Sequence, residues 1–391
     1  MPAIDRSIPQ GHPPKRLLFV STFPPTLCGI ASFTSSLVDA ILDVSDGRQP
    51  TGVIRMLPHD EDQLLSDDPR IIAELATDDP SWPLNAISSC EREDFLWIQH
   101  EYGIFGPNDG SAVLDLTGEA PIPVAVTLHT VPGEPTGRQQ SIIESLCAAA
   151  RWVVVMSRAA RERLLSYDID PSRVRVVPHG AALIPADMRH PPDRPTILNW
   201  GLIGPGKGLE WGIEAMAHLR HLDPPPLLLI EGVTHPNVLR REGEAYRAHL
   251  TRLIADLGVE DMVEIDSGYL RPDALIDLMR RAQLVLLPYD STDQVTSGVL
   301  VEAIGAGIPV IATAFPHAVE LLSRGAGAVV PHRNPAAIAS AVEHLLSTPD
   351  ALRHARARAQ QVAHGLAWPR VAIEYMRLAR EIADSGAANV A

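Results

Sequence analysis

Lysine is nearly absent from this chain of 391 residues. Lys15 and Lys207 are the two lysines among 33 lysines and arginines. With 48 acidic residues the formal net charge is −15. Nucleic-acid-binding surfaces often contain runs of basic residues interleaved with aromatic residues, and this chain has no such run. The composition therefore argues against a nucleic-acid partner, although a basic patch confined to one site would not show in the net charge.

Cysteine and long hydrophobic runs are also scarce. Cys28, Cys90 and Cys147 are odd in number, widely spaced and without a CxxC pair. This pattern gives no disulfide or metal framework and fits a reducing compartment. The N-terminal segment MPAIDRSIPQGHPPKR is polar, and only the short run LLFV follows it, so we expect neither a signal peptide nor a spanning helix. We predict a cytoplasmic protein and leave contact with a membrane surface open.

Short apolar runs, each followed by a stretch with helical periodicity, recur along the chain. They are RLLFVST, TGVIRML, FLWIQH, PVAVTLHT, WVVVMS, VRVVPHG, TILNWGLI, LLLIEGV, MVEIDSG, LVLLPY, PVIAT and GAVVP. Continuous apolar runs of this length are typical of parallel strands buried on both faces. The predicted fold class is α/β, with two Rossmann-like, doubly wound domains that face each other across a cleft.

A proline-rich segment, residues 184–195, interrupts this alternation. Its prolines neither continue a helix nor donate to a sheet ladder, so we interpret it as a linker. The predicted domains are 1–188 and 189–367. The remaining residues, 368–391, have apolar side chains at helical spacing and predict a closing helix that packs back towards the N-terminal domain. These apolar residues include Val371, Ile373, Met376 and Leu378.

The second half opens with GLIGPGKGLEWGIEAM, residues 201–216. A glycine-rich turn between a strand and a helix lets backbone N–H groups approach an anion. Gly204, Gly206 and Gly208 would supply the bare backbone, and Lys207 a compact cation for phosphate oxygens. Neither the GxGxxG pattern nor the Walker pattern is matched. The alternative is a helix cap with a solvated lysine.

A second candidate motif is QVTSGVLVEAIGAGIPVIAT, residues 294–313. Ser297 is a good N-cap for a helix running from about Val299 to Gly305, and Gly298 keeps its N-terminus open to a ligand. Glu302, one turn into that helix, is placed to accept hydrogen bonds from sugar hydroxyls. By itself, this glutamate would be interpreted as a surface residue one turn into a helix.

These motifs resemble a known family. The segments VPHG at 177–180, GLIGPGKGLEWGIEA and VEAIGAGIPVIAT are similar to the retaining glycosyltransferases of family 4, also called group 1, which have the GT-B fold. The resemblance extends over nearly the whole chain, because STFPPTLCGIASF, IQHEYGIFG and TLHTV resemble the N-terminal half of that family.

The resemblance implies a sugar-nucleotide site in the C-terminal domain. Lys207 would contact the diphosphate, and Glu302 would hold the ribose as the last residue of the EX7E motif. Gln294 stands where this motif has its first glutamate. Its amide can still bind sugar hydroxyls, but it cannot supply a negative charge.

A second departure lies beside the lysine. The family often has an arginine five residues before it, and this chain has Leu202. The helix N-terminus formed by Ser297, Gly298 and Val299 is a candidate to supply the remaining phosphate contacts.

In the N-terminal domain the resemblance implies acceptor and cleft residues. Gly29 would let backbone approach the phosphates or the acceptor, and His129 would lie near the transferring sugar. A buried histidine paired to backbone is the alternative for His129. His100 and Glu101 would either bind acceptor hydroxyls or brace a loop, and His179 of VPHG would join the cleft.

The implied reaction moves a hexose from a UDP-, GDP- or ADP-sugar to an acceptor hydroxyl with retention of anomeric configuration. His129, Lys207 and Glu302 are the implied catalytic residues. The family is usually metal-independent, so we expect no metal and no cofactor.

Two alternatives stay open. A sugar-nucleotide epimerase or a phosphorylase would share the fold, although a phosphorylase needs a lysine for pyridoxal and only Lys15 and Lys207 are available. A catalytically silent sugar-nucleotide-binding protein would fit Gln294 and Leu202. The sequence does not identify the sugar, the base, the acceptor or the oligomeric state.

Overall fold

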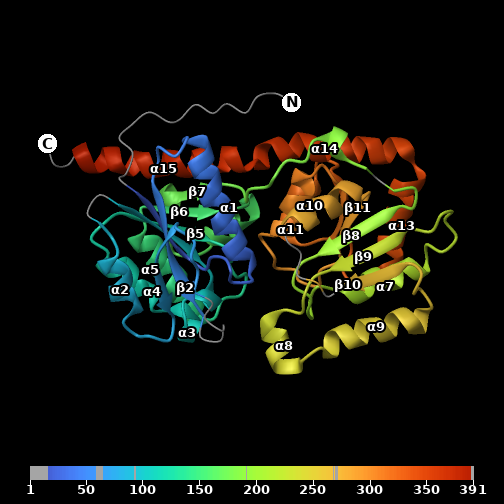
Figure 1. Cartoon of the computed structure of the whole chain (residues 1–391), viewed down its shortest axis with the longest axis horizontal. Coiled ribbons are helices and arrows are strands. Elements are labelled where there is room, and N and C mark those ends of the chain that lie inside the picture. The colour runs from blue at the N-terminus through green and yellow to red at the C-terminus, as the bar shows by residue number, and fades with distance from the viewer. Residues whose placement is uncertain are drawn as a thin grey trace. The chain divides into compact units, whose positions relative to one another are not determined.

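The computed structural model describes residues 16–58, 65–91, 94–190, 192–266, 268 and 272–388. The chain forms two compact units. Unit one comprises residues 1–180 and 368–391, and unit two comprises residues 181–367. Each unit is built on a wholly parallel sheet, which confirms the α/β fold class (Figure 1).

The units divide between Gly180 and Ala181, eight residues before the expected boundary at 188/189. The Ala181 N–H donates to Leu366 (2.7 Å), and Ala181 and Ile184 are both buried in the core of unit two. The Arg189 guanidinium donates to the Gly307 carbonyl at 2.8 Å. The first part of the proline-rich segment is therefore packed onto unit two, so its interpretation as a free linker is wrong there.

The sheet of unit one has seven strands in the order β3-β2-β1-β4-β5-β6-β7. Their bounds are β1 Leu17–Ser21, β2 Thr51–Leu57, β3 Ile71–Ala76, β4 Phe95–His100, β5 Val124–Leu128, β6 Trp152–Val155 and β7 Val174–Val176. Strand β3 was not predicted from the sequence. It is an edge strand with no fully buried residue, so it lacks the continuous apolar run of its neighbours.

Helices cover this sheet. They are α1 Gly29–Val44, α2 Trp82–Ser88, α3 Pro107–Gly110, α4 Val113–Glu119, α5 Gly137–Ala149, α6 Arg158–Leu164 and α15 Trp368–Ala388, with 3-10 turns η1 Tyr102–Ile104 and η2 Pro171–Arg173. Helix α15 packs against α1 and buries Val371, Tyr375, Met376 and Leu378 in one core with strand residues of β1 and β4 (Figure 1). The C-terminal segment is therefore part of unit one.

The sheet of unit two has six strands in the order β10-β9-β8-β11-β12-β13. The strands are β8 Thr196–Trp200, β9 Leu227–Glu231, β10 Val263–Asp266, β11 Leu284–Leu287, β12 Val310–Thr313 and β13 Gly327–Val330. The helices are η3 Ala186–Met188, α7 Leu209–Ala217, α8 Pro236–Glu242, α9 Ala245–Leu257, α10 Pro272–Arg281, α11 Gly298–Gly305, α12 Pro316–Leu322, α13 Pro335–Ser347 and α14 Pro349–Leu366.

Alternate residues of these strands enter cores on opposite faces of the sheet. Ile197, Leu284 and Leu286 belong to one buried cluster. Leu198 and Val285 belong to the other. Because both faces are covered, the strand sequences are apolar throughout instead of alternating.

Each sheet has a topological switch point, where successive crossovers leave in opposite directions. It lies between β1 and β4 in unit one and between β8 and β11 in unit two. In open α/β sheets, ligands bind outside the carboxyl ends of the strands at such points.

Among the described helices, none is long and apolar enough to cross a membrane.

Candidate functional site

The glycine-lysine loop follows β8 at the switch point of unit two. Gly208 has φ +61° and caps α7, and a Cβ there would lie 2.0 Å from the Pro288 carbonyl oxygen. The Asp290 N–H donates to the Gly206 carbonyl at 3.0 Å. The loop is thus fixed to the segment that follows β11, and this close approach requires glycine at position 208.

Lys207 extends over an aromatic ring. Its Nζ lies 4.6 Å from the centroid of Tyr289, whose own side chain is buried and stacked on Phe315. In the described part of the chain, no carboxylate forms an ion pair with this ammonium. A cation–π contact leaves the N–H donors of lysine available for an anionic ligand.

Helix α11 begins at Gly298, one residue earlier than expected, and Ser297 is confirmed as its N-cap. The Ser297 hydroxyl accepts from the Leu300 N–H at 3.3 Å, and the Ser297 N–H donates to His317 Nδ1 at 2.9 Å. The N–H groups of Gly298 and Val299 lie in the first turn, where no intrahelical acceptor exists. They form a positive helix end suited to an anion.

Glu302 contacts the last residue of β8. The Trp200 indole N–H donates to Glu302 Oε2 at 3.1 Å. Burial raises the pKa of Glu302, and this hydrogen bond partly opposes the increase. A Cβ on Gly201 would lie 3.8 Å from Val299, so the start of α11 packs directly against the carboxyl end of β8.

Gln294 turns back onto its own loop. Its Nε2 donates to the Thr296 carbonyl at 2.9 Å, and the side chain is partly buried. One amide donor is therefore engaged locally.

Several charged residues near Lys207 were missed by the sequence analysis. Asp290 accepts from the Trp211 indole at 2.9 Å and from Arg333 Nε at 3.1 Å. Arg333 has φ +54°, a left-handed conformation uncommon for arginine. Burial, and then Lys207 and two arginines of α8, lower the pKa of His235. Asp290 and Arg333 follow the carboxyl ends of β11 and β13, which is the signal that could have identified them.

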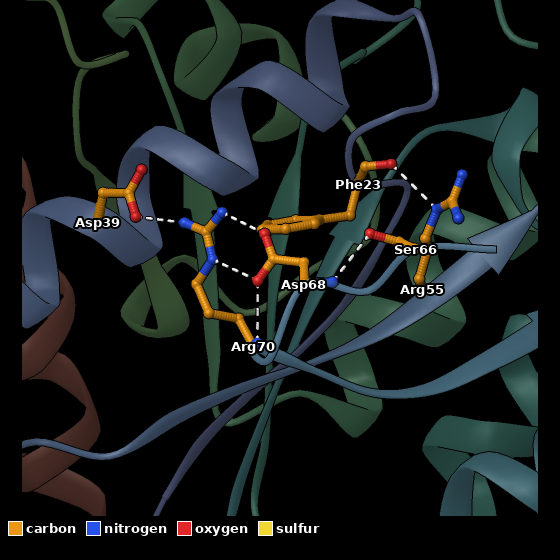
Figure 2. Close-up of polar contacts among 6 residues, drawn as sticks. All are labelled: Phe23, Asp39, Arg55, Ser66, Asp68 and Arg70. Carbon is orange, nitrogen blue, oxygen red and sulfur yellow. Dashed lines mark hydrogen bonds and ion pairs between the residues drawn. The ribbon is translucent and has the colours of Figure 1, made fainter. Parts of the chain in front are cut away.

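In unit one, the loop after β1 is anchored from β2. Arg55 is buried, and its Nε donates to the Phe23 carbonyl at 3.1 Å (Figure 2). The same guanidinium donates to Thr26 at 3.0 Å and forms an ion pair with Glu74 at 2.6 Å. These bonds fix the backbone that leads into α1.

Arg70 provides a second anchor beside this loop. Its guanidinium lies 4.9 Å from the ring centroid of Phe23. The guanidinium also donates hydrogen bonds to Asp68 and to Asp39, which lies on α1 (Figure 2). These hydrogen bonds lower the pKa of Asp68.

Gly29 is the first residue of α1, and its N-cap is Cys28, whose Sγ accepts from the Ala31 N–H at 3.3 Å. Gly29 is exposed, and a Cβ there would meet nothing within 4 Å. The first turn of α1 is open to solvent on this side within unit one.

His129 ends β5 and pairs with a glutamine of β4. Its Nε2 lies 2.9 Å from Gln99 Oε1. Burial first, and then the neighbouring histidines, lower the pKa of His129 to about 3. The ring is therefore neutral at pH 7. The alternative interpretation expected the His129 ring to pair with a backbone group. The ring pairs with the Gln99 side chain instead.

His100 and Glu101 end the neighbouring strand. The His100 ring is fully buried, and both of its nitrogens lack a hydrogen-bond partner among the described residues. Glu101 accepts from the Thr130 hydroxyl and, at 3.0 Å, from the Tyr102 N–H. These contacts brace the loop between β4 and η1, which fits the second of the two roles expected for the pair.

His179 is buried beside α1. Its Nδ1 donates to the Gly180 carbonyl at 2.7 Å, and burial lowers its pKa to about 4. The Phe33 ring lies 4.9 Å from the ring centroids of both His179 and His129, and 5.3 Å from that of Trp368. Unit one thus gathers two of its predicted histidines around one phenylalanine of α1.

The structure brings several of the predicted site residues together within each unit. In unit two, Lys207, the α11 N-terminus and Glu302 lie on segments joined at the β8/β11 switch point. In unit one, His100 and His129 are joined by a backbone hydrogen bond of 3.0 Å.

Comparison with known families agrees with this architecture. Residues 182–362 match the family described as Glycosyl transferases group 1, and residues 71–183 match Glycosyltransferase Family 4. The chain belongs to the group 1 glycosyltransferases. The loop before Gly29 lies outside both matched ranges.

Curated relatives of this glycosyltransferase are similar at a modest level. The D-inositol 3-phosphate glycosyltransferase 1 of Catenulispora acidiphila is 28% identical over 290 residues, which cover 68% of each chain. The D-inositol 3-phosphate glycosyltransferase of Streptomyces bingchenggensis is 31% identical over 255 residues, which cover 61% of this chain and 54% of the relative. The matched segment thus spans about half the length of the second relative.

Solved structures share the fold. Anabaena Alr3699/HepE in complex with UDP has a TM-score of 0.71 at 16% identity, covering 95% of this chain and all of that one. A glycosyltransferase from Rickettsia africae has a TM-score of 0.72 at 17% identity, covering 94% and 99%. The glycosyltransferase has the GT-B fold, as the sequence motifs implied.

Proposed function

We propose that this glycosyltransferase moves a hexose from a nucleoside-diphosphate sugar to an acceptor hydroxyl with retention of anomeric configuration. One observation carries the proposal. An ammonium on a glycine loop and the N-terminus of a helix lie on segments joined at the switch point of one parallel sheet. Both groups favour the same ligand chemistry, a phosphate anion.

The charges of unit two suit departure of a nucleoside diphosphate. Negative charge builds up on the phosphates as the bond to the sugar breaks, and fixed positive groups stabilise that charge most strongly. Lys207 would supply one such group, and the Gly298 and Val299 N–H groups would supply the helix end. Glu302 would accept hydrogen bonds from the ribose hydroxyls.

Unit one would bind the acceptor, with His129 near the transferring sugar. Its neutral ring can donate from one nitrogen and accept at the other. We propose that neither a cofactor nor a metal takes part, as the resemblance to a usually metal-independent family implies. Cys28, Cys90 and Cys147 form no disulfide, which favours a cytoplasmic location.

UDP is the base to test first, because Anabaena Alr3699/HepE was solved with UDP and with UDP-glucose. A phosphorylated cyclitol is the first acceptor to test, because the curated relatives are named D-inositol 3-phosphate glycosyltransferases.

The experiment has two stages. A thermal-shift panel of UDP, GDP, ADP and their sugars identifies the donor, because a ligand that binds the folded state raises its apparent stability. The selected donor is then incubated with candidate acceptors, with and without EDTA, and the anomeric configuration of the product is read by NMR. An inverted product would refute retention, and activity lost with EDTA and restored by magnesium would refute metal independence. Binding without hydrolysis or transfer would favour the silent binding protein.

A further inference from the structure

Gln99 is the hydrogen-bond partner of His129. The two residues lie at the carboxyl ends of neighbouring strands, β4 and β5, and the Gln99 side chain is fully buried. Its amide oxygen, as placed, lies 2.9 Å from His129 Nε2. No described residue forms a hydrogen bond with His129 Nδ1. Which nitrogen of the ring carries the proton therefore depends on which end of the amide faces Nε2.

A buried polar chain leads from β4 to the C-terminal helix. The Trp97 indole N–H can only donate, and it donates to the Thr127 hydroxyl at 2.9 Å. Thr127 in turn contacts the Tyr375 hydroxyl of α15 at 3.0 Å. Burial raises the pKa of Tyr375. Among the described residues, the Gln99 side chain has hydrogen-bonding geometry with His129 Nε2 alone.

The orientation of this amide can be decided by counting donors and acceptors. With the oxygen towards His129, the Gln99 nitrogen is buried without a partner in hydrogen-bonding geometry. A buried N–H without an acceptor is rarer than a carbonyl oxygen with one weak contact. Exchanging the two ends directs the amide N–H group to His129 Nε2 at the same 2.9 Å separation and leaves an acceptor oxygen where the unpartnered nitrogen was. Oxygen and nitrogen of an amide are assigned from such networks.

We propose that Gln99 donates to His129 Nε2 and thereby holds His129 as the tautomer with its proton on Nδ1. Gln99 is a positioning residue, and the inference rests on the proposed function in so far as His129 acts at the transferring sugar. His129 then presents an N–H donor, and not a lone pair, to a substrate oxygen.

The tautomer can be observed directly. The protein is labelled with 15N-histidine, and long-range 1H–15N spectra are recorded with and without a His129→Asn substitution to assign His129 among the 15 histidines. We expect a protonated Nδ1 in the wild type. Gln99→Glu places an acceptor-only carboxylate at this position and is expected to put the proton on Nε2. Tyr102→Phe, which removes another buried tyrosine hydroxyl of unit one, should keep the wild-type tautomer.

Kinetics supply the second measurement. Because the wrong tautomer removes a preorganised donor, Gln99→Glu should lower kcat about a hundredfold with little change in KM for the sugar nucleotide. A wild-type ring protonated on Nε2, or a Gln99→Glu variant with the wild-type tautomer, would overturn the inference. The wild-type spectrum decides even if a variant does not fold.

The inference and the proposed function fail in different ways. If His129 carries its proton on Nδ1 but the protein transfers no sugar, the tautomer assignment holds and the proposed transfer reaction is refuted. Sugar transfer by a protein with the proton on Nε2 would refute only the assignment.

Discussion

Replacing Lys207 by methionine removes the ammonium while keeping most of the side-chain stem. Lys207 is the single lysine of unit two, and Leu202 leaves no cation at the position where the family often has an arginine. We therefore expect the diphosphate to depend strongly on this residue. Loss of one preorganised charge contact typically costs about 3 to 4 kcal/mol in the transition state. At about 1.4 kcal/mol per factor of ten, kcat should fall at least about a hundredfold.

The same substitution should hardly affect folding. The ammonium lies over the Tyr289 ring and is otherwise partly exposed, and such a contact contributes about 0.5 to 1 kcal/mol. In a unit of this size 1 kcal/mol shifts Tm by about 2 to 4 °C. Lys207→Met should therefore unfold within about 4 °C of the wild type.

The assay measures kcat and KM by release of the nucleoside diphosphate, alongside thermal unfolding. Lys207→Arg retains the charge and should be less impaired. Arg324→Ala removes an exposed positive charge elsewhere in unit two and should turn over like the wild type. Near-wild-type kcat in a folded Lys207→Met protein would refute the phosphate role, and a Tm loss well beyond 4 °C would refute the structural reasoning.

Three further predictions concern the supports of the two sites. Gly208→Ala forces a Cβ to within 2.0 Å of a carbonyl oxygen, so it should lower the free energy of unfolding by about 3 kcal/mol or more. Gly206 has φ +88° but open space around its Cα. Gly206→Ala should therefore lower the free energy of unfolding by about 1 to 2 kcal/mol. Equal losses in urea titrations would contradict this. Because burial raises the folded-state pKa of Glu302 above its unfolded value, its stabilising effect is full at low pH and is lost as pH rises through the folded pKa. From about pH 4 to pH 7 the wild type should lose more stability than Glu302→Gln, and parallel urea midpoints at the two pH values would disprove the assignment. Arg55→Met removes the ion-pair partner of the partly buried Glu74 and should cost about 3 kcal/mol by urea unfolding, with part recovered when Glu74→Leu is added. No recovery in the double variant would show that the loss came from the loop bonds instead.

The fold could be predicted because its signals are local. Runs such as LLFV and LVLL are apolar throughout, since both faces of a parallel strand are covered, and each is followed by helical periodicity. The N-cap role of Ser297 was also readable, because capping depends on residue type and near neighbours. Strand β3 escaped because an edge strand buries less and needs no such run. The domain boundary was misplaced because residues 181–189 pack by tertiary contacts that their prolines do not reveal.

The sequence by itself determined the two doubly wound sheets and the chemical types at their switch points: a glycine loop with a lysine, a capped helix with a glutamate, and histidines at strand ends. Only the tertiary structure decided what each side chain contacts. Tyr289 under Lys207, Trp200 on Glu302 and Gln99 on His129 come from segments separated in the chain. Contacts of this kind depend on strand order and register, which local periodicity does not encode.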